Sequence, residues 1–292
     1  MTNIFVISHQ PGKALNDEVY KSIAVGPKKD HFSQEFFRDD VGENIAEKNS
    51  FYNEMTAIYW VYKHVNEFKD TDHFGFAHYR RLFCFNGKKA AYVKKDIVED
   101  LISVSNEQLD KIFKDYDFVV PRPSHYKSVQ DHFEKSHNKE DLSKLLDVID
   151  RLCPEYYETA VEYLTQKNEY LYNMFIFSKE DFIKYGDFIF KVLDEFTKDF
   201  DDSKRLYVSE RLTGIFVYSL IKSQKKPLLL PILHVRSKSL KAARKQVKQN
   251  FKEKADRGFI YKVKPLILCL LPRHLEQWYR RRKARWANNM II

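Results

Sequence analysis

The chain has 292 residues, of which 43% are hydrophobic and 15% aromatic, enough to bury a core in one large domain or in a domain with an appendage. Its 8 glycines and 9 prolines argue against a low-complexity chain, and its three cysteines form no CxxC pair, which fits a reducing cytoplasm and gives no zinc or disulfide framework. We also find neither a secretion signal nor an apolar run of the roughly 20 residues that span a bilayer.

Predicted strands and helices alternate along most of the chain. Strands are predicted at 3–8 and 22–26, then a helix at 43–66, a strand at 73–78, a helix at 105–114 and a strand at 117–121. Helices at 138–151 and 154–167 follow, then a strand at 172–178, helices at 179–198 and 209–223, and a strand at 227–235. This alternation predicts an α/β domain with a mostly parallel sheet over residues 1–235.

Polar side chains follow several of the predicted strands. His9 comes after the first strand, the segment HYRR (His78–Arg81) after the third, and residues 121–124 after the fourth. In sheets of this class ligands bind beyond the carboxyl ends of the strands. The sequence therefore predicts a site at this edge.

The HYRR segment carries hydrogen-bonding groups suited to a phosphorylated ligand. In an extended chain His78 and Arg80 point one way and Tyr79 and Arg81 the other. An arginine can donate two parallel hydrogen bonds to phosphate oxygens, and tyrosine can stack on a base or a sugar. We therefore favour a ligand site, although either arginine could instead pair with a carboxylate of the acidic body.

The predicted helix at 43–66 has two distinct faces. An apolar arc gathers Phe51, Met55, Ile58, Tyr62 and Val65, as expected of a core-facing surface. A neighbouring arc instead carries amides, aromatics and a hydroxyl: Lys48, Asn49, Tyr52, Asn53, Thr56 and Trp60. Such a face suits the lining of a ligand pocket, and it equally suits packing against a polar loop.

Two further segments place polar groups at the ends of predicted elements. Asn173 begins a buried strand, where its amide could bind sugar hydroxyls or simply form a turn. Ser209 is predicted as the N-cap of the following helix, with Glu210 and Arg211 in its first turn. Glu210 could act as a general base, or it could only stabilise the helix N-terminus.

Several familiar signatures are missing from the sequence. We find no Walker loop, no GxGxxG and no HExxH, and no cysteine or histidine cluster. Asp39-Asp40 and Asp70-Thr71-Asp72 are the only tight acidic clusters that could hold Mg²⁺ or Mn²⁺, and we expect both to be solvated turns.

The charge of the chain is uneven. Residues 221–292 hold 20 lysines and arginines against 3 acidic residues, whereas residues 1–220 hold 30 against 38. Residues 236–292 are predicted to form a basic helical tail, in which Leu275, Trp278, Tyr279, Trp286 and Met290 share one helical face. This composition is typical of a helix at a membrane surface, although a solvated basic helix would look similar.

Taken together, these segments resemble a family of bacterial capsular and exopolysaccharide glycosyltransferases that has long been catalogued as a domain of unknown function. The resemblance covers roughly residues 1–235 and rests on the motifs GxNIxxKNxxYxExTAxYW, GxxHYRR, DxxxP, NMFI and ERL in this order. The matching residues are Gly42, Asn44, Ile45, Lys48, Asn49, Tyr52, Glu54, Thr56, Ala57, Tyr59, Trp60, Gly75, His78–Arg81, Asp117, Pro121, Asn173–Ile176 and Glu210–Leu212.

The resemblance implies a GT-A-like nucleotide-sugar-binding fold and an inverting hexosyltransferase activity. The implied donor is a UDP-sugar such as UDP-galactofuranose, and the implied acceptor is a lipid-linked oligosaccharide of capsule, exopolysaccharide or O-antigen synthesis. The residues expected to bind the nucleotide sugar are His9, Lys48, Asn49, Tyr52, Thr56, His78, Tyr79, Arg80, Arg81, Asn173 and Arg211, with Glu210 as the catalytic base.

In metal-dependent GT-A enzymes a DxD motif ends a central strand and holds a divalent ion on the diphosphate. HYRR takes an equivalent strand end here, so we expect Arg80, Arg81 and His78 to supply the positive charge and expect no metal cofactor. The tail would bind the anionic inner leaflet, giving a cytoplasmic protein peripherally attached to the cell membrane.

Two other classes of function remain open at this point. A nucleic-acid-binding protein would use the basic tail, but the acidic body and the lack of a recognition motif lead us to expect no nucleic-acid partner. A non-catalytic sugar-binding scaffold would keep the fold and the ligand site without turnover.

Overall fold

The computed structural model describes residues 1–87, 91–93, 98–199 and 206–235, together with the isolated positions 247, 248, 251 and 263. Met1–Val235 form one compact unit and Arg236–Ile292 a second. Apart from those isolated positions, the predicted basic tail lies outside the described residues. In the described part of the chain, no helix has the length and apolar character needed to cross a membrane.

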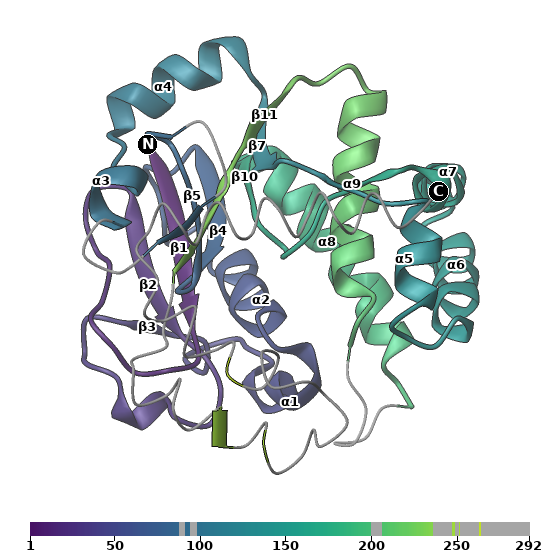
Figure 1. The fold of residues 1–292 in the computed structure, drawn as a ribbon, viewed down its shortest axis with the longest axis horizontal. Helices are drawn as coiled ribbons and strands as arrows, with labels where there is room; N and C mark the ends of the chain where they lie inside the picture. The colour runs from purple at the N-terminus through teal and green to yellow at the C-terminus, as the bar shows by residue number, and fades with distance from the viewer. Residues whose placement is uncertain are drawn as a thin grey trace. The chain divides into compact units, whose positions relative to one another are not determined.

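A twisted sheet forms the centre of the first unit (Figure 1). Its main path, in spatial order, is β11 Pro227–Leu230, β7 Phe118–Pro121, β10 Phe175–Ser178, β4 His73–His78, β1 Thr2–Ser8, β2 Tyr20–Ala24 and β3 Phe37–Arg38. Neighbours on this path are parallel except β10, which runs antiparallel to both β4 and β7. The predicted α/β fold with a mostly parallel sheet is therefore confirmed.

Short strands extend the sheet beside this path. They are β5 Arg81–Phe83, β6 Ala91–Val93 and β12 Ile232–Val235, with β12 antiparallel to β5 and parallel to β6. β8 Ser124–His125 and β9 Asn168–Glu169 form a separate two-stranded sheet. The single strand predicted at 227–235 is thus two strands, β11 and β12, because Pro231 interrupts the run and each half finds a different partner.

The alternation of side chains along the strands builds two cores, one on each face of the sheet. Phe74 and Phe76 of β4 and Phe175 and Phe177 of β10 lie on one face, with rings in stacked or tilted contact. Smaller side chains face the other way, among them Ala77 of β4. The run FGFA is therefore buried on both faces, as parallel strands usually are.

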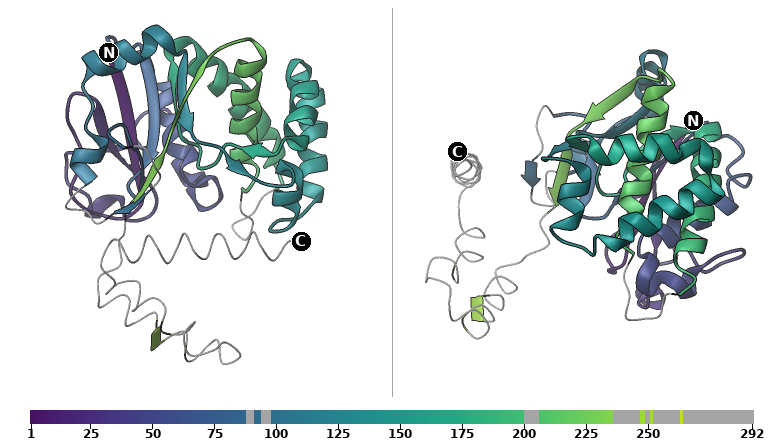
Figure 2. Two further views of the ribbon diagram at one scale, coloured as in Figure 1. Left: turned by 45° about the horizontal axis from the view of Figure 1, so that its top comes forward. Right: turned by 90° about the vertical axis from the view of Figure 1, so that its right-hand side faces the viewer.

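Helices cover both faces (Figures 1 and 2). The phenylalanine face packs against α2 Met55–Lys63, α8 Lys179–Phe196 and α9 Ser209–Lys222, and α5 Val129–Glu134, α6 Glu140–Leu152 and α7 Tyr157–Thr165 extend this layer. The other face packs against α3 Val98–Ile102 and α4 Asn106–Asp115. Short 3-10 helices within the described ranges are Lys29–His31, Ala46–Lys48 and Pro154–Tyr156.

The helix predicted at 43–66 is broken. It consists of the 3-10 turn Ala46–Lys48, the single turn α1 Asn49–Tyr52, and α2 Met55–Lys63. Asn53 interrupts it with φ 52° and ψ −125°, a left-handed conformation that favours glycine. The break changes the direction in which the side chains on either side of Asn53 point, so the two predicted faces are not continuous.

Candidate active site

A cavity of about 480 Å³ opens at the carboxyl ends of β1 and β4, the edge of the sheet predicted to carry a site. Its walls come from the turns after β1, β2 and β4, from the region of α1, and from the first turn of α9. The predicted residues that line it are His9, Asn49, His78, Tyr79, Arg80, Arg81 and Glu210. Asn53, from the polar arc of the predicted helix, also lines it, as do residues that were not predicted as site residues, including Gln10, Lys28, Glu54 and Tyr172.

HYRR forms a tight hairpin rather than an extended segment. His78 ends β4 and pairs with Arg81, the first residue of β5, so that Tyr79 and Arg80 form the turn between them. All four side chains line the cavity, which corrects the expectation that they would point alternately to opposite sides. The guanidinium of Arg80 lies 5.0 Å from the ring centre of Tyr79. Within the described residues neither arginine forms an ion pair with a carboxylate.

Tyr172 connects the hairpin to the opposite carboxylate. Its carbonyl oxygen lies 2.5 Å from Nε2 of His78, so that nitrogen must carry the proton it donates. Its backbone N–H donates to Oε1 of Glu210 at 2.9 Å, and its ring lies 4.7 Å beneath the guanidinium of Arg81. Tyr172 has φ 80° and Asn173 φ 48°. This left-handed turn just before β10 allows Tyr172 to contact the side chains of His78, Arg81 and Glu210.

Two carboxylates face the cavity. Glu210 lies in the first turn of α9 with 28% of its side chain exposed, and Arg211 approaches its second oxygen at 3.3 Å. Burial raises the pKa of Glu210, while the charge of Arg211 opposes that rise. Glu54, at the start of α2, accepts a hydrogen bond of 2.9 Å from Nδ2 of Asn173. Burial thus prepares Glu210 to take up a proton more readily than an exposed carboxylate.

Lys28 and His9 add further polar groups to the lining. The ring of His9 meets Tyr79 edge to face, with 5.2 Å between the ring centres. Burial lowers the pKa of His9, and the charges of Arg80 and Lys28 lower it further. His9 is therefore neutral near pH 7, and the positive charge in this part of the cavity comes from Arg80, Arg81 and Lys28.

Some predicted binding residues lie away from this cavity. Lys48 and Tyr52 instead line a second cavity of about 490 Å³, where Lys48 pairs with Asp194 at 3.2 Å. All three residues precede the break at Asn53, and the turns Ala46–Lys48 and α1 direct Asn49 to the first cavity and Lys48 and Tyr52 to the second. The hydroxyl of Tyr52 is buried against Thr197.

Thr56, Asn173 and Arg211 are buried behind the cavity wall. Thr56 donates to Asp39, and Asn173 bridges Glu54 and Ser209. Arg211 is only 4% exposed and forms a 2.8 Å ion pair with Glu169. Thr56 contacts Asn49, Asn173 contacts Glu54 and Arg211 contacts Glu210, so these three residues support the cavity wall without lining it.

Two local predictions near the site are wrong. Ser209 is not the N-cap of α9; that residue is Val208, and the Ser209 hydroxyl accepts from Asn173 instead. Asp39 is not solvated but fully buried, because Lys29 and Thr56 both donate to its carboxylate. Asp70 and Asp72 are exposed, as expected. In the described ranges no group of three or more His, Cys, Asp or Glu side chains is placed to hold a metal ion.

The structure is thus an α/β fold with a cavity whose lining includes arginines, a lysine and carboxylates. Residues 3–223 match the sequence family DUF4422, a domain of unknown function, and the chain belongs to that family. Among solved structures, the chain is similar to the apo structure of WbbM, a bifunctional glycosyltransferase, with a TM-score of 0.70 and 27% sequence identity. That similarity covers 81% of this chain and 45% of the WbbM chain. No curated protein matches the sequence.

Proposed function

We propose that this protein is a glycosyltransferase that moves a sugar from a nucleotide-diphosphate donor to the hydroxyl group of an acceptor saccharide. The observation that carries the proposal is the hairpin His78–Arg81, which directs two arginines without ionic partners among the described residues into the cavity that Glu210 also lines. The similarity to a bifunctional glycosyltransferase supports the same class of reaction. That similarity identifies neither the donor nor the acceptor.

The arginines are proposed to bind the diphosphate. Guanidinium groups donate parallel hydrogen bonds to phosphate oxygens, and in a partly water-excluded cavity they stabilise negative charge more strongly than in bulk water. When the sugar is transferred, the bond between its anomeric carbon and the diphosphate breaks and charge develops on the departing nucleotide. Arg80 and Arg81, with His78 beside them, would stabilise that charge in the role that a divalent ion fills in related enzymes.

Glu210 is proposed as the base. An acceptor hydroxyl would lose its proton to the carboxylate while its oxygen forms the new bond to the anomeric carbon, on the face opposite the leaving diphosphate. This displacement inverts the anomeric centre. The raised pKa of Glu210, caused by burial, favours proton uptake at this point.

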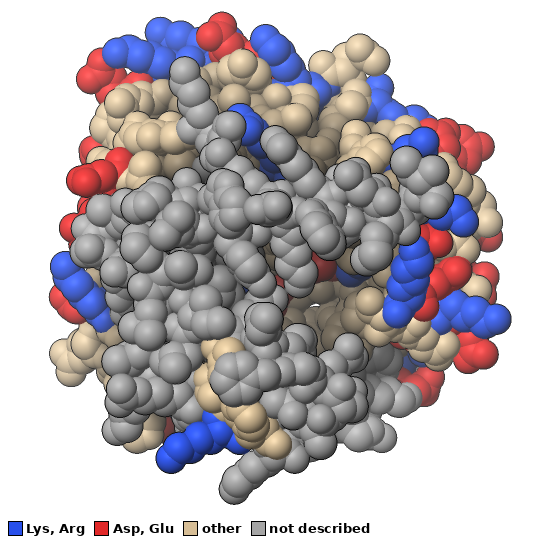
Figure 3. Space-filling view, in the orientation of Figure 1, with Lys and Arg blue, Asp and Glu red and all other residues tan. Residues whose placement is uncertain are grey.

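The finer identity of the substrates follows from the resemblance and belongs to the proposal. The donor would be a UDP-sugar such as UDP-galactofuranose, and the acceptor a lipid-linked oligosaccharide. Residues 236–292, with their basic and aromatic composition, would hold the protein on an anionic membrane surface where such acceptors lie. On the face in Figure 3, the described acidic and basic side chains are interspersed around the edge.

The proposal is tested first by thermal shift. The purified full chain is melted with UDP, GDP, CMP and their sugars, with and without Mn²⁺ and EDTA. A ligand that binds only the folded state raises the melting temperature. We expect a UDP-specific rise that survives EDTA. If no nucleotide raises the melting temperature, the proposed function is wrong. If activity is lost in EDTA and restored by Mn²⁺, the arginines do not replace a metal.

A further inference from the structure

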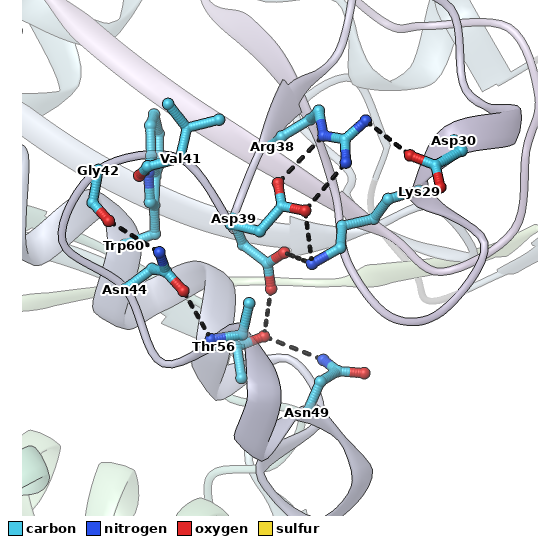
Figure 4. A network of polar contacts seen from close by, with 12 residues as sticks. Lys29, Asp30, Arg38, Asp39, Val41, Gly42, Asn44, Asn49, Thr56 and Trp60 are labelled. Carbon is cyan, nitrogen blue, oxygen red and sulfur yellow. Dashed lines mark hydrogen bonds and ion pairs between the residues drawn. The ribbon is translucent and has the colours of Figure 1, made fainter.

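A buried polar chain lies behind one wall of the cavity (Figure 4). Asp39 is fully buried, and its carboxylate accepts from Nζ of Lys29 at 2.9 Å and from Oγ1 of Thr56 at 2.5 Å. Asn49, which lines the cavity, donates from Nδ2 to Oγ1 of Thr56 at 2.9 Å. A side chain of the cavity wall is thus connected through a single hydroxyl to a buried charge.

The direction of each hydrogen bond in this chain is fixed by chemistry. A carboxylate and a backbone carbonyl can only accept, and Thr56 has one hydroxyl proton, for which Asp39 and the carbonyl of Asn53 are its acceptors. Towards Asn49, therefore, Thr56 can only accept. The carbonyl of Asn53 accepts from the same Nδ2 at 2.8 Å. These two contacts assign the amide of Asn49, whose nitrogen and oxygen could otherwise be exchanged.

With its nitrogen held in this way, Asn49 turns its oxygen away from Thr56, as Figure 4 shows. Among the described residues none donates a hydrogen bond to that oxygen. It lies beside Gly26, which follows β2 with φ 82°. A Cβ added to Gly26 would stand 3.1 Å from Oδ1 of Asn49 and 3.9 Å from Cβ of His9. The missing side chain leaves room beside this oxygen, between two residues of the cavity lining.

We infer that Asn49 is a specificity-determining residue of the cavity, held by Asp39 through Thr56 so that its side-chain oxygen accepts a hydrogen bond from a donor group of the nucleotide. This inference rests on the proposed function. The donor group is either the imide N–H of a uracil ring or a hydroxyl of the ribose. A ligand that presents a hydrogen-bond acceptor at this point would face the side-chain oxygen of Asn49, which is also an acceptor. The buried network prevents the Asn49 amide from rotating to present its nitrogen instead.

The first test compares UDP with two analogues, each of which lacks one donor group that UDP has. Isothermal titration of the full chain is carried out with UDP, with CDP and with 2′-deoxy-UDP. The ring nitrogen of cytosine at the imide position has no proton, and 2′-deoxy-UDP lacks one ribose hydroxyl. In the wild type we expect one of the two to bind about tenfold more weakly than UDP, in line with the loss of one hydrogen bond.

In Asn49→Ala that tenfold difference should disappear, and the analogue for which it disappears identifies the group that Asn49 recognises. If Asn49→Ala keeps both preferences unchanged, Asn49 does not read the nucleotide and the inference is wrong, while the proposed function stands. If the wild type binds no nucleotide at all, the proposed function fails and this inference fails with it.

The second test asks whether the buried chain sets the selectivity. Thr56→Val removes the hydroxyl, so the ratio of the dissociation constant of the weaker-binding analogue to that of UDP should fall towards one. Thr56→Ser keeps the hydroxyl and should keep this ratio. Asp30→Asn alters only the exposed end of the same network, where Asp30 contacts Arg38, and should leave the ratio of dissociation constants unchanged. Melting curves check that each variant is folded.

A measurement without ligand completes this test. In ¹⁵N-labelled protein, exchange of the Asn49 side-chain amide protons should be faster in Thr56→Val than in the wild type or in Thr56→Ser. Full selectivity in Thr56→Val, with unchanged exchange, would show that Thr56 does not orient Asn49.

Discussion

The two walls of the cavity use charge in opposite ways. The wall built by His78–Arg81 presents its arginines to the cavity, and within the described residues they have no carboxylate partner. The wall that carries Asn49 has charges behind it, where Lys29 bridges Asp39 at 2.9 Å and Asp40 at 3.2 Å, and Asn49 presents a neutral amide in front of them. In the proposed function the first wall binds an anion, and the second recognises a donor group of the nucleoside.

Because of this difference, substitutions in the two walls should affect different properties of the protein, ligand binding in one case and folding stability in the other. Charge without a protein partner contributes little to folding but strongly to the binding of an opposite charge. Charge that is buried and paired is costly to disrupt, because removing one partner leaves the other without compensation. Substitutions in the first wall should therefore reduce activity and leave stability intact, whereas substitutions behind the second wall should reduce stability.

The largest effect is expected from Glu210→Gln. The glutamine can still accept from the backbone N–H of Tyr172, but it cannot take up a proton, so turnover should fall by about 10²–10⁴-fold. The melting temperature should stay the same or rise, because a carboxylate disfavoured by burial is removed. Single-turnover assays and melting curves measure the two effects. Near-normal turnover would remove Glu210 from the role of base and favour a non-catalytic scaffold.

The second largest effect is expected from Arg81→Ala, which should lower kcat/KM by about 10²–10³-fold. Arg81→Lys should recover only part of this loss, because an ammonium group cannot donate the paired hydrogen bonds of a guanidinium. Both variants should melt near the wild-type temperature. Arg38→Ala is the matched control, since Arg38 pairs with Asp30 and Asp40 outside the cavity. Equal losses in kcat/KM for the Arg38 and Arg81 variants would contradict the assignment of Arg81 to the diphosphate.

Asp39→Ala should mainly affect folding. It leaves Lys29 without its closer carboxylate and Thr56 without its carboxylate acceptor, and breaking such a buried pair costs about 3 kcal/mol. Urea unfolding followed by circular dichroism measures the change. Asp30→Ala, at the exposed end of the same network, should leave the midpoint unchanged. A similar midpoint for the wild type and Asp39→Ala would mean that the second wall does not depend on its buried charge.

The position of the cavity that forms the candidate site could be predicted from the sequence because it depends on local order. The run FGFA identifies a strand buried on both faces, and the rule that ligands bind beyond the carboxyl ends of such strands places His78 and its neighbours at the site. The hairpin formed by HYRR could not be predicted in the same way. It depends on β5 pairing with β12, which lies about 150 residues farther along the chain.

The residues that sequence reasoning missed are those defined by distant contacts. Asp39 appeared to be a turn residue, and only Lys29 and Thr56 explain its burial. Glu54 belongs to the family motif, but its helical pattern gave no reason to single it out; its place in the lining follows from the break at Asn53, which no glycine or proline marks. Pro231, by contrast, was a visible signal that residues 227–235 could not form one strand.

The smallest effect concerns that break. Asn53 holds φ 52° and ψ −125°, and its carbonyl accepts from both Asn49 and Thr56. Glycine adopts this conformation without strain, so Asn53→Gly should stabilise the fold by about 1 kcal/mol, reduced by the loss of the hydrogen bond from its amide to the carbonyl of Phe51. Urea unfolding measures this gain. Asn53→Ala is the control, because it loses the same side-chain amide but keeps the backbone strain. It should be less stable than both the Asn53→Gly variant and the wild type. If the glycine variant is no more stable than the alanine variant, the break carries no strain, and the second wall is held by its buried network alone.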